Sequence, residues 1–333
     1  MSIAIRSFAK INLGLKIGPL RADGFHELCT VYQTIALHDL VQVDVQPGSG
    51  IELQCASPLV PLNQSNTCYK VAERVMKATQ AQGKVLIEIR KNLPVQGGLG
   101  AASSNGVATL LGLERALGTQ LSAEDRLRIA GEVGSDLPLF LVGGTVLGIG
   151  RGEEVHPLRD LPTMHLVVVT PPVGVSTPAA FARWDEMVGR DAELTGTDAA
   201  GTINKLDQGI FDWPSESILS QAAPASEPAS GVPAMGGDRA ETLLLDLVRA
   251  GIENDFERVV FPEYPELREV RRVLEREGAR FASLSGSGSA LYGLFASSGE
   301  AQTAAARMTT AGHAAVATTS LTRDEYWNAM VGG

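Results

Sequence analysis

Apolar and polar residues alternate along much of the first 90 residues, a pattern typical of β-strands with one buried face. The alternating segments are 3–5, 11–17, 41–45, 51–55 and 85–90. Segments 41–45 and 51–55 flank the turn-forming residues 47–50. We therefore expect these two segments to form an antiparallel pair.

Helical spacing of apolar residues follows between and after these strands. The expected helices are 67–80, 101–117, 123–132, 240–256, 264–278 and 299–311, and the later expected strands are 164–170, 281–284, 291–295 and 314–318. Strand 164–170 is apolar throughout, which favours burial on both faces. Asn66 and Ser122 stand where N-caps are needed, and Ser122 has Asp125 at capping-box spacing. Residues 221–238, rich in Ala, Pro, Ser and Gly, indicate a mobile insert or a long loop. The pattern as a whole predicts an α+β protein.

A glycine-rich stretch, residues 93–106, lies between an expected strand and an expected helix. Its small residues let the backbone approach a ligand, and the first N–H groups of the helix point into that space. Ser103, Ser104 and Asn105 could cap the helix or add polar contacts. Such a terminus favours an anion, most often a phosphate, although a flexible loop that only caps a helix is the alternative. The stretch lacks the Lys of a Walker loop, so a Lys or a metal ion elsewhere must offset the phosphate charge.

Polar residues near the N-terminus form a second candidate for binding. Lys10 and Asn12 fall on the face opposite the aliphatic side chains of segment 11–17. That face is either a ligand surface or the solvated side of an edge strand. The turn-rich segment that follows brings Phe25 and His26 together, and it is a candidate substrate loop.

Two later stretches also hold residues that could bind a ligand or take part in a reaction. Asp136 is a single carboxylate between Gly134-Ser135 and an apolar run, where it either caps a short helix or takes part in a reaction. The glycine turn 285–289 lies between two expected strands. It either brings backbone amides to a ligand or is a plain hairpin turn.

Composition narrows the classes of function. The net charge of −10 argues against nucleic acid as the main partner. Cys29, Cys55 and Cys68 lack metal-binding spacing and are expected to be reduced thiols of a cytoplasmic protein. No apolar run is long enough for a membrane span, and the N-terminus has no signal-peptide pattern. The glycine-rich stretch, Lys10 and Asp136 could supply the phosphate cradle, the cation and the base that phosphoryl transfer needs.

The stretch from Pro94 to Ser104 resembles the Pro-x-x-x-Gly-Leu-Gly-Ser-Ser-Ala phosphate loop of the galactokinase, homoserine, mevalonate and phosphomevalonate (GHMP) kinase superfamily. Further blocks match in order and spacing over nearly the whole chain, at 9–13, 21–28, 103–105, 134–140 and 285–288. The resemblance implies a two-domain α+β fold with the active site in the cleft between the domains. Residues 1–162 would form the N-terminal ATP-binding domain, and residues 163–333 the C-terminal domain with the 221–238 insert.

Blocks 9–13 and 21–28 separate one branch of that superfamily from its sister kinases. For this branch the resemblance implies an ATP-dependent kinase that phosphorylates the 2-hydroxyl of 4-diphosphocytidyl-2-C-methyl-D-erythritol in non-mevalonate isoprenoid precursor biosynthesis. Asp136 would accept the hydroxyl proton. Lys10 would hold Asp136 ionised and stabilise the transferring phosphoryl group. Mg²⁺ is expected with the ATP, with no protein ligand assigned.

The resemblance also assigns binding residues. Those implied at ATP are Asn66, Lys91, Pro94, Gly97, Gly98, Leu99, Gly100, Ala101, Ala102, Ser103 and Ser104. Those implied at the substrate are Asn12, Phe25, His26, Tyr32 and Phe181. Phe25 would stack on cytosine, where the family often has Tyr, His26 would bond the edge of the base, and Phe181 would cover its other face.

The sequence departs from the family pattern at two places. Gln96, Ala101 and Ala102 stand where the family usually has glycine, which would change ATP affinity if those positions need a positive φ. The insert at 185–238 is longer than expected, so the resemblance does not place the part of the substrate wall to which it belongs. The alternatives are another small-alcohol kinase of the superfamily and a non-catalytic nucleotide-binding protein. We expect a cytoplasmic monomer or weak homodimer that acts on a small molecule and binds neither nucleic acid nor a membrane.

Overall fold

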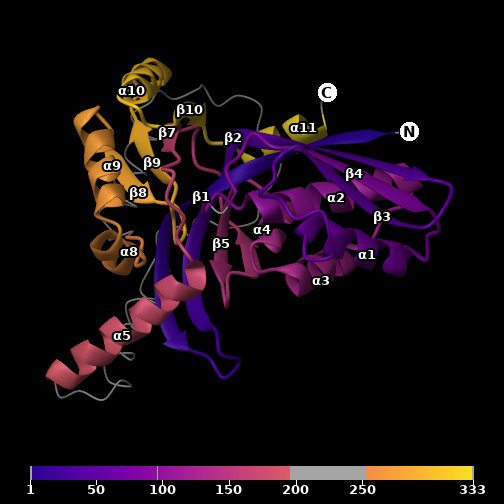
Figure 1. The fold of residues 1–333 in the computed structure, drawn as a ribbon, viewed down its shortest axis with the longest axis horizontal. Helices are drawn as coiled ribbons and strands as arrows, with labels where there is room; N and C mark the ends of the chain where they lie inside the picture. The colour runs from indigo at the N-terminus through magenta and orange to yellow at the C-terminus, as the bar shows by residue number, and fades with distance from the viewer. Residues whose placement is uncertain (1, 96, 196–252, 332–333) are drawn as a thin grey trace.

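The computed structural model describes residues 2–95, 97–195 and 253–331. Within them, two sheets lie side by side (Figure 1). The first sheet consists of β1 (Ile3–Leu20), β2 (His26–Gln46), β3 (Gly50–Cys55), β4 (Lys84–Arg90), β5 (Thr145–Ile149) and β6 (Glu154–Pro157), in the order β3-β4-β2-β5-β6 with β1 also paired to β2. The second sheet has the order β10 (Ala315–Thr319), β7 (His165–Val169), β9 (Leu291–Phe295) and β8 (Phe281–Leu284). The α+β class is confirmed.

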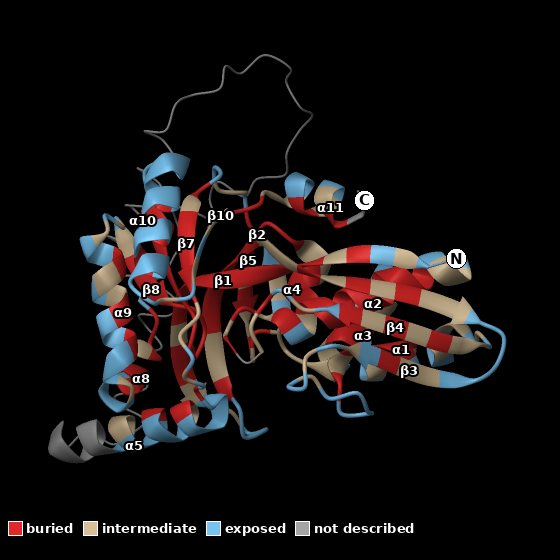
Figure 2. Ribbon diagram, turned by 45° about the horizontal axis from the view of Figure 1, so that its top comes forward, coloured by how far each residue is buried: buried red, intermediate tan, exposed pale blue. Residues whose placement is uncertain are grey.

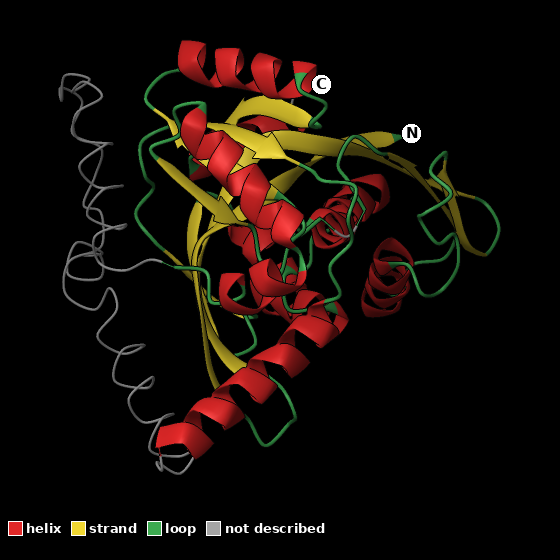
Figure 3. Ribbon diagram, turned by 60° about the vertical axis from the view of Figure 1, so that its left-hand side comes forward, coloured by secondary structure: helices red, strands yellow, loops and turns green. Residues whose placement is uncertain are grey.

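Helices cover both sheets (Figures 1 and 3). The first sheet carries α1 (Thr67–Thr79), α2 (Ala101–Leu117), α3 (Ala123–Val133) and α4 (Leu137–Val142). The second sheet carries α9 (Pro265–Arg276) and α10 (Ser298–Thr310), with α8 (Glu257–Glu263) beside them. Helix α5 (Thr177–Thr195) extends away from the second sheet, and α11 (Arg323–Val331) returns to pack near β1. None of the helices in the described part of the chain is both long and apolar enough to cross a membrane.

Most expected elements are present near their expected bounds. The N-caps are confirmed, because Asn66 accepts a hydrogen bond from the Cys68 N–H and Ser122 accepts one from the Asp125 N–H. The expected helix 240–256 lies largely outside the described residues, and its end is wrong, because residues 253–256 are not helical and the next helix begins at Glu257. The expected insert at 221–238 also lies outside the described residues, and the boundary between residues 162 and 163 stays a prediction. Helices α5, α8 and α11 were not expected.

The predicted pairing of segments 41–45 and 51–55 is wrong. Strand β4 lies between β2 and β3, antiparallel to β2 and parallel to β3, with Ile87 opposite both Val43 and Leu53. The chain crosses from β3 to β4 through α1, and a helical crossover of this kind is what parallel strands require. The turn residues 47–50 therefore lead the chain to a different position in the sheet.

Both faces of β1 are buried, and Figure 2 shows the burial along this strand. Ile11 and Leu13 pack with Leu166 and Val168 of β7 in the core between the two sheets. Val167 and Val169, on the other face of β7, pack under α9 and α10. Strand β7 is therefore apolar on both faces, as expected. Because the reverse face of β1 is also covered, Lys10 and Asn12 are 3% and 1% exposed rather than solvated.

Candidate active site

Lys10 and Asn12 form the polar floor of a cavity of about 600 Å³. Lys10 Nζ donates to Asn12 Oδ1 at 2.7 Å, and Asn12 Nδ2 donates to Thr30 Oγ1 at 2.7 Å. These bonds fix the Lys10 ammonium at one point, which lies 3.8 Å from Asp136 Oδ2. Burial lowers the pKa of Lys10, and the attraction of Asp136 opposes that shift only in part.

Asp136 occupies the N-cap position of α4, but its side chain accepts no capping hydrogen bond. Its carboxylate lies in the cavity instead, 36% exposed, and accepts a hydrogen bond from Tyr32 Oη at 3.2 Å. Burial, followed by the negative charge of Asp136, raises the pKa of Tyr32 well above its usual value, so Tyr32 stays a donor. The carboxylate is thus free of a capping role and held by a cation and a phenol.

The glycine-rich stretch leads into the N-terminus of α2 above this floor. Gly98 and Gly100 have φ angles of +74° and +69°, the left-handed region that favours glycine. A Cβ on Gly98 would lie 2.1 Å from the Ser285 carbonyl oxygen, and one on Gly100 would lie 2.8 Å from Cζ of Phe140. The backbone therefore packs too closely here for any side chain, and the first turn of α2 faces the cavity.

Two expectations for this stretch are corrected. The N-cap of α2 is Gly100, without a side-chain capping bond, so Ser103, Ser104 and Asn105 do not cap the helix but lie in its first turns. Ala101 and Ala102 are helical too, and Gln80 is the one non-glycine residue with positive φ among the described positions. The concern that these alanines need a positive φ therefore does not apply. Gln96 lies outside the described residues.

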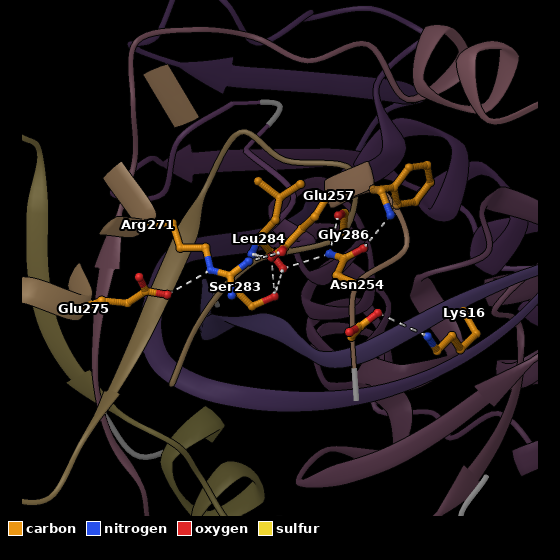
Figure 4. A network of polar contacts seen from close by, with 10 residues as sticks. Lys16, Asn254, Glu257, Arg271, Glu275, Ser283, Leu284 and Gly286 are labelled. Atoms are coloured by element: carbon orange, nitrogen blue, oxygen red, sulfur yellow. Dashed lines mark hydrogen bonds and ion pairs between the residues drawn. The ribbon is translucent and has the colours of Figure 1, made fainter. Parts of the chain in front are cut away.

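The second glycine turn, 285–289, packs against the first rather than forming an isolated hairpin. Ser285 Oγ donates to the Gly98 carbonyl oxygen at 3.0 Å, and the Ala290 N–H donates to the Gly97 carbonyl oxygen at 3.1 Å. Asn254 Nδ2 supports the turn from behind by donating to the carbonyl oxygens of Leu284 and Gly286 (Figure 4). Two backbone turns from different sheets thus meet at the cavity.

Glu257 extends this support, as Figure 4 shows. Its Oε1 accepts from Ser283 Oγ and from the Leu284 N–H, both at 2.8 Å, and its Oε2 pairs with Arg271 at 2.6 Å. Burial raises the pKa of Glu257, with the Arg271 charge opposing that shift. The start of the turn is therefore fixed by a half-buried charge network.

Asn66 and Lys91 lie at the end of the cavity beside α1. Asn66 uses its side chain as the N-cap of that helix, and Lys91 pairs with buried Asp39. Asp39 also accepts from the N–H groups of Asn92 and Leu93, which fixes the chain just before the glycine-rich stretch. The Lys91 charge is thus committed to the scaffold of the glycine-rich stretch.

Aromatic residues gather at the opposite end. The rings of His26 and Phe181 stack in parallel with centroids 5.2 Å apart, and His26 Nε2 lies 3.0 Å from Asp185 Oδ1. Phe25 is about half exposed on the turn between β1 and β2, and the guanidinium of Arg151 lies 5.0 Å from its ring centroid. This end presents flat apolar surfaces next to polar groups, which suits a nucleobase.

The structure brings together nearly every residue that the sequence singled out. Ser104 is the exception, because it is buried against Ser7 and does not line the cavity. Sequence reasoning missed further residues in or behind the cavity wall: Asp39, Arg151, Thr177 and Asp185. Arg151, between two glycines in a turn, carried a local signal. Asp39 carried none, since it looks like any polar position of an alternating strand.

Comparison with known proteins agrees with this geometry. Residues 66–144 match the GHMP kinases N terminal domain, and residues 240–314 match the GHMP kinases C terminal domain. The N-terminus of α2 and the Lys10–Asp136 pair line one cavity, an arrangement compatible with phosphoryl transfer. The chain belongs to the GHMP kinases.

Within that class, the similar proteins include kinases of one substrate. The chain is 36% identical to a 4-diphosphocytidyl-2-C-methyl-D-erythritol kinase of Solibacter usitatus over 87% of this chain and 80% of the relative. It is 32% identical to one of Acaryochloris marina over 92% of this chain and 91% of the relative. A crystal structure of a 4-(cytidine 5'-diphospho)-2C-methyl-D-erythritol kinase matches with a TM-score of 0.69 and 28% identity, covering 96% of this chain and 99% of that one. The chain is thus a member of the 4-diphosphocytidyl-2-C-methyl-D-erythritol kinase family.

Proposed function

We propose that this protein transfers the γ-phosphoryl group of ATP to the 2-hydroxyl of 4-diphosphocytidyl-2-C-methyl-D-erythritol, a step of non-mevalonate isoprenoid precursor biosynthesis. The observation that carries the proposal is the Lys10–Asp136 pair, which lies in the same cavity as the N-terminus of α2 and the aromatic end at Phe25 and His26. The substrate has its reacting hydroxyl at one end and its cytosine at the other. The cavity has the Lys10–Asp136 pair for the hydroxyl and the aromatic end for the cytosine.

In this mechanism the hydroxyl oxygen attacks the γ-phosphorus while the bond from the γ-phosphorus to the β–γ bridging oxygen breaks and ADP leaves. Asp136 Oδ2 or Oδ1 takes the hydroxyl proton. Lys10 lies next to the developing charge, and its bond to Asn12 keeps the ammonium in place without rearrangement. The backbone N–H groups at the start of α2 bind the phosphates of ATP.

Mg²⁺ fits this site as a partner of the nucleotide rather than as a resident metal. No group of three or more His, Cys, Asp or Glu side chains within the described residues could hold a metal ion. Asp136 is the one carboxylate among the described residues that line the cavity. Mg²⁺ commonly takes one carboxylate together with phosphate oxygens and water. Bound in that way, the ion would offset phosphate charge, while the proton transfer stays with Asp136.

At the far end, Phe25 would stack on cytosine, and His26 would bond the edge of the base. Phe181 stacks on His26, so it supports the imidazole as well as walling the cavity. The His26 Nδ1 lies 3.0 Å from the Gly18 carbonyl oxygen, which can only accept, so Nδ1 carries a proton. This contact fixes the orientation of the ring, and Nε2, which lies 3.0 Å from Asp185 Oδ1, would exchange that contact for the edge of the base.

The test is an ADP-release assay with Mg-ATP and 4-diphosphocytidyl-2-C-methyl-D-erythritol on the wild type and on Asp136→Asn. Asn keeps the shape of Asp but accepts no proton, so we expect kcat to fall by about 10²–10⁴-fold while ATP still binds. Asp324→Asn, an exposed Asp on α11, is the matched control and should turn over normally. Turnover with homoserine or mevalonate in place of this substrate would move the protein to a sister kinase. Full activity of Asp136→Asn would remove this base from the mechanism.

A further inference from the structure

Arg151 lies on the tight turn between β5 and β6, and its side chain lines the cavity. Glu153 fixes it from behind: Oε2 accepts the Arg151 backbone N–H at 2.6 Å, and Oε1 accepts from Nε at 3.1 Å. The guanidinium lies over the Phe25 ring, 5.0 Å from its centroid. Three contacts thus hold a cation that is still 32% exposed.

This turn lies between the two ends of the proposed substrate site. On one side it contacts Phe25, at the end that suits the nucleobase. On the other it packs against Tyr32, since a Cβ on Gly152 would lie 2.6 Å from Tyr32 Oη. That hydroxyl donates to Asp136 at 3.2 Å. The turn that carries Arg151 therefore contacts residues of both the aromatic end and the reacting end.

The charges of the cavity single out the same residue. Lys10, Lys91 and Arg151 are the three Lys and Arg residues among the described residues that line it. Lys10 is engaged by Asn12 and Asp136, and Lys91 by Asp39 at the other end. A substrate with a diphosphate between its base and its alcohol needs a cation between those ends. A guanidinium whose Nε is engaged has four further N–H donors, enough for a bidentate phosphate contact.

We propose that Arg151 binds the diphosphate bridge of the cytidine-containing substrate, so that the site recognises a pyrimidine nucleoside diphosphate as a unit. The inference rests on the proposed function, because it takes the nucleobase to lie at Phe25. Contact with Phe25 and the bond from Nε to Glu153 hold the guanidinium at the cavity wall. The phosphate contact is what distinguishes this role from mere support of the aromatic ring.

Calorimetric titration of the full chain with cytidine and with CDP tests the proposal. We expect the wild type to bind CDP more tightly than cytidine. Arg151→Ala should weaken CDP binding about tenfold or more, the size expected for losing a charge-assisted contact, while cytidine affinity changes by no more than about twofold. Arg151→Lys keeps the charge but not the paired N–H donors of the guanidinium, so its affinity for CDP should lie between those of the wild type and Arg151→Ala. Arg272→Ala, an exposed arginine of α9 that also faces a single carboxylate, is the matched control and should leave both affinities unchanged.

Other outcomes would overturn the inference. If Arg151→Ala loses affinity for cytidine and for CDP by the same factor, Arg151 only supports Phe25. Phe25→Leu serves as the reference for such an equal loss of affinity. An unchanged preference for CDP would remove Arg151 from the site while leaving the proposed function intact. If the wild type binds neither ligand, the cytidine site itself is wrong, and the proposed function fails with it. Should Arg151→Ala not fold, Arg151→Gln replaces it in the same comparison.

Discussion

Lys10 is a buried ammonium group. The proposed reaction needs its charge, but burial disfavours the charged form. Desolvation lowers the pKa of Lys10, and the carboxylate of Asp136 only partly restores it. A lowered pKa in the folded state means that the charged form opposes folding. This opposition is present in full below the lowered pKa and is relieved as pH rises from that pKa to the ordinary value of 10.5. The site thus keeps a cation at a cost to stability, as functional sites often do.

A pH profile of kcat/KM tests this account of Lys10. We expect activity to fall on the alkaline side with an apparent pKa below 10.5, since kcat/KM reports groups of the free enzyme. Tyr32 cannot cause such a fall, because its pKa lies well above its usual value. In Tyr32→Phe, kcat is expected to drop, with the alkaline limb still below 10.5. A wild-type limb at or above 10.5 would show that the Lys10 pKa is not depressed.

At the scale of elements, the site depends on two backbone turns in contact, which makes Gly98 the most sensitive point. Gly98→Ala combines a left-handed φ, which costs an alanine about 1–2 kcal/mol, with a Cβ 2.1 Å from the Ser285 carbonyl oxygen. We expect lower unfolding free energy and weaker ATP binding, measured by urea denaturation and by nucleotide titration. Gly131→Ala in α3 is the control, because its Cβ meets no atom within 4 Å. That substitution should stabilise the protein by about 0.5–1 kcal/mol. Normal ATP binding by Gly98→Ala would contradict the need for this close approach.

Short sequence patterns predicted those parts of the fold and the site that depend only on residues close together in the sequence. The caps at Asn66 and Ser122, the apolar strand β7 and the glycine-rich stretch are each determined by residues within a few positions of one another. The pairing of β3 with β4 is set instead by a helical crossover, so the turn at 47–50 pointed to the wrong partner. Asp39 pairs with Lys91, which is 52 residues away in the sequence, and a short sequence pattern cannot predict a contact between residues so far apart. The same holds for Arg151, whose place over Phe25 depends on two hairpins meeting.

At the scale of the whole molecule, residues 253–255 connect the first sheet to the second glycine turn. Leu15 of β1 donates to the Glu253 carbonyl oxygen and accepts from the Asp255 N–H, which adds this segment to the edge of β1. Asn254, 2% exposed, then holds the turn that contacts Gly98. Strand β1 carries Lys10 as well. Lys10 and both glycine turns are thus positioned by one continuous set of contacts that crosses the two sheets.

Asn254→Ala tests whether this connection positions the nucleotide. It removes three buried hydrogen bonds, two to the carbonyl oxygens of Leu284 and Gly286 and one from the Phe256 N–H, so we expect the unfolding free energy to fall by about 1–3 kcal/mol. Because the turn then moves relative to the loop at Gly98, KM for ATP should rise roughly threefold or more, beyond what lost stability explains. Met308→Ala, in the core under α10, should destabilise by about 2–5 kcal/mol without displacing the turn, so its KM for ATP should stay near the wild-type value. If both variants raise KM equally, stability rather than position governs ATP binding. If Asn254→Ala loses stability at normal KM, the turn is held by its contacts with Gly97 and Gly98 alone.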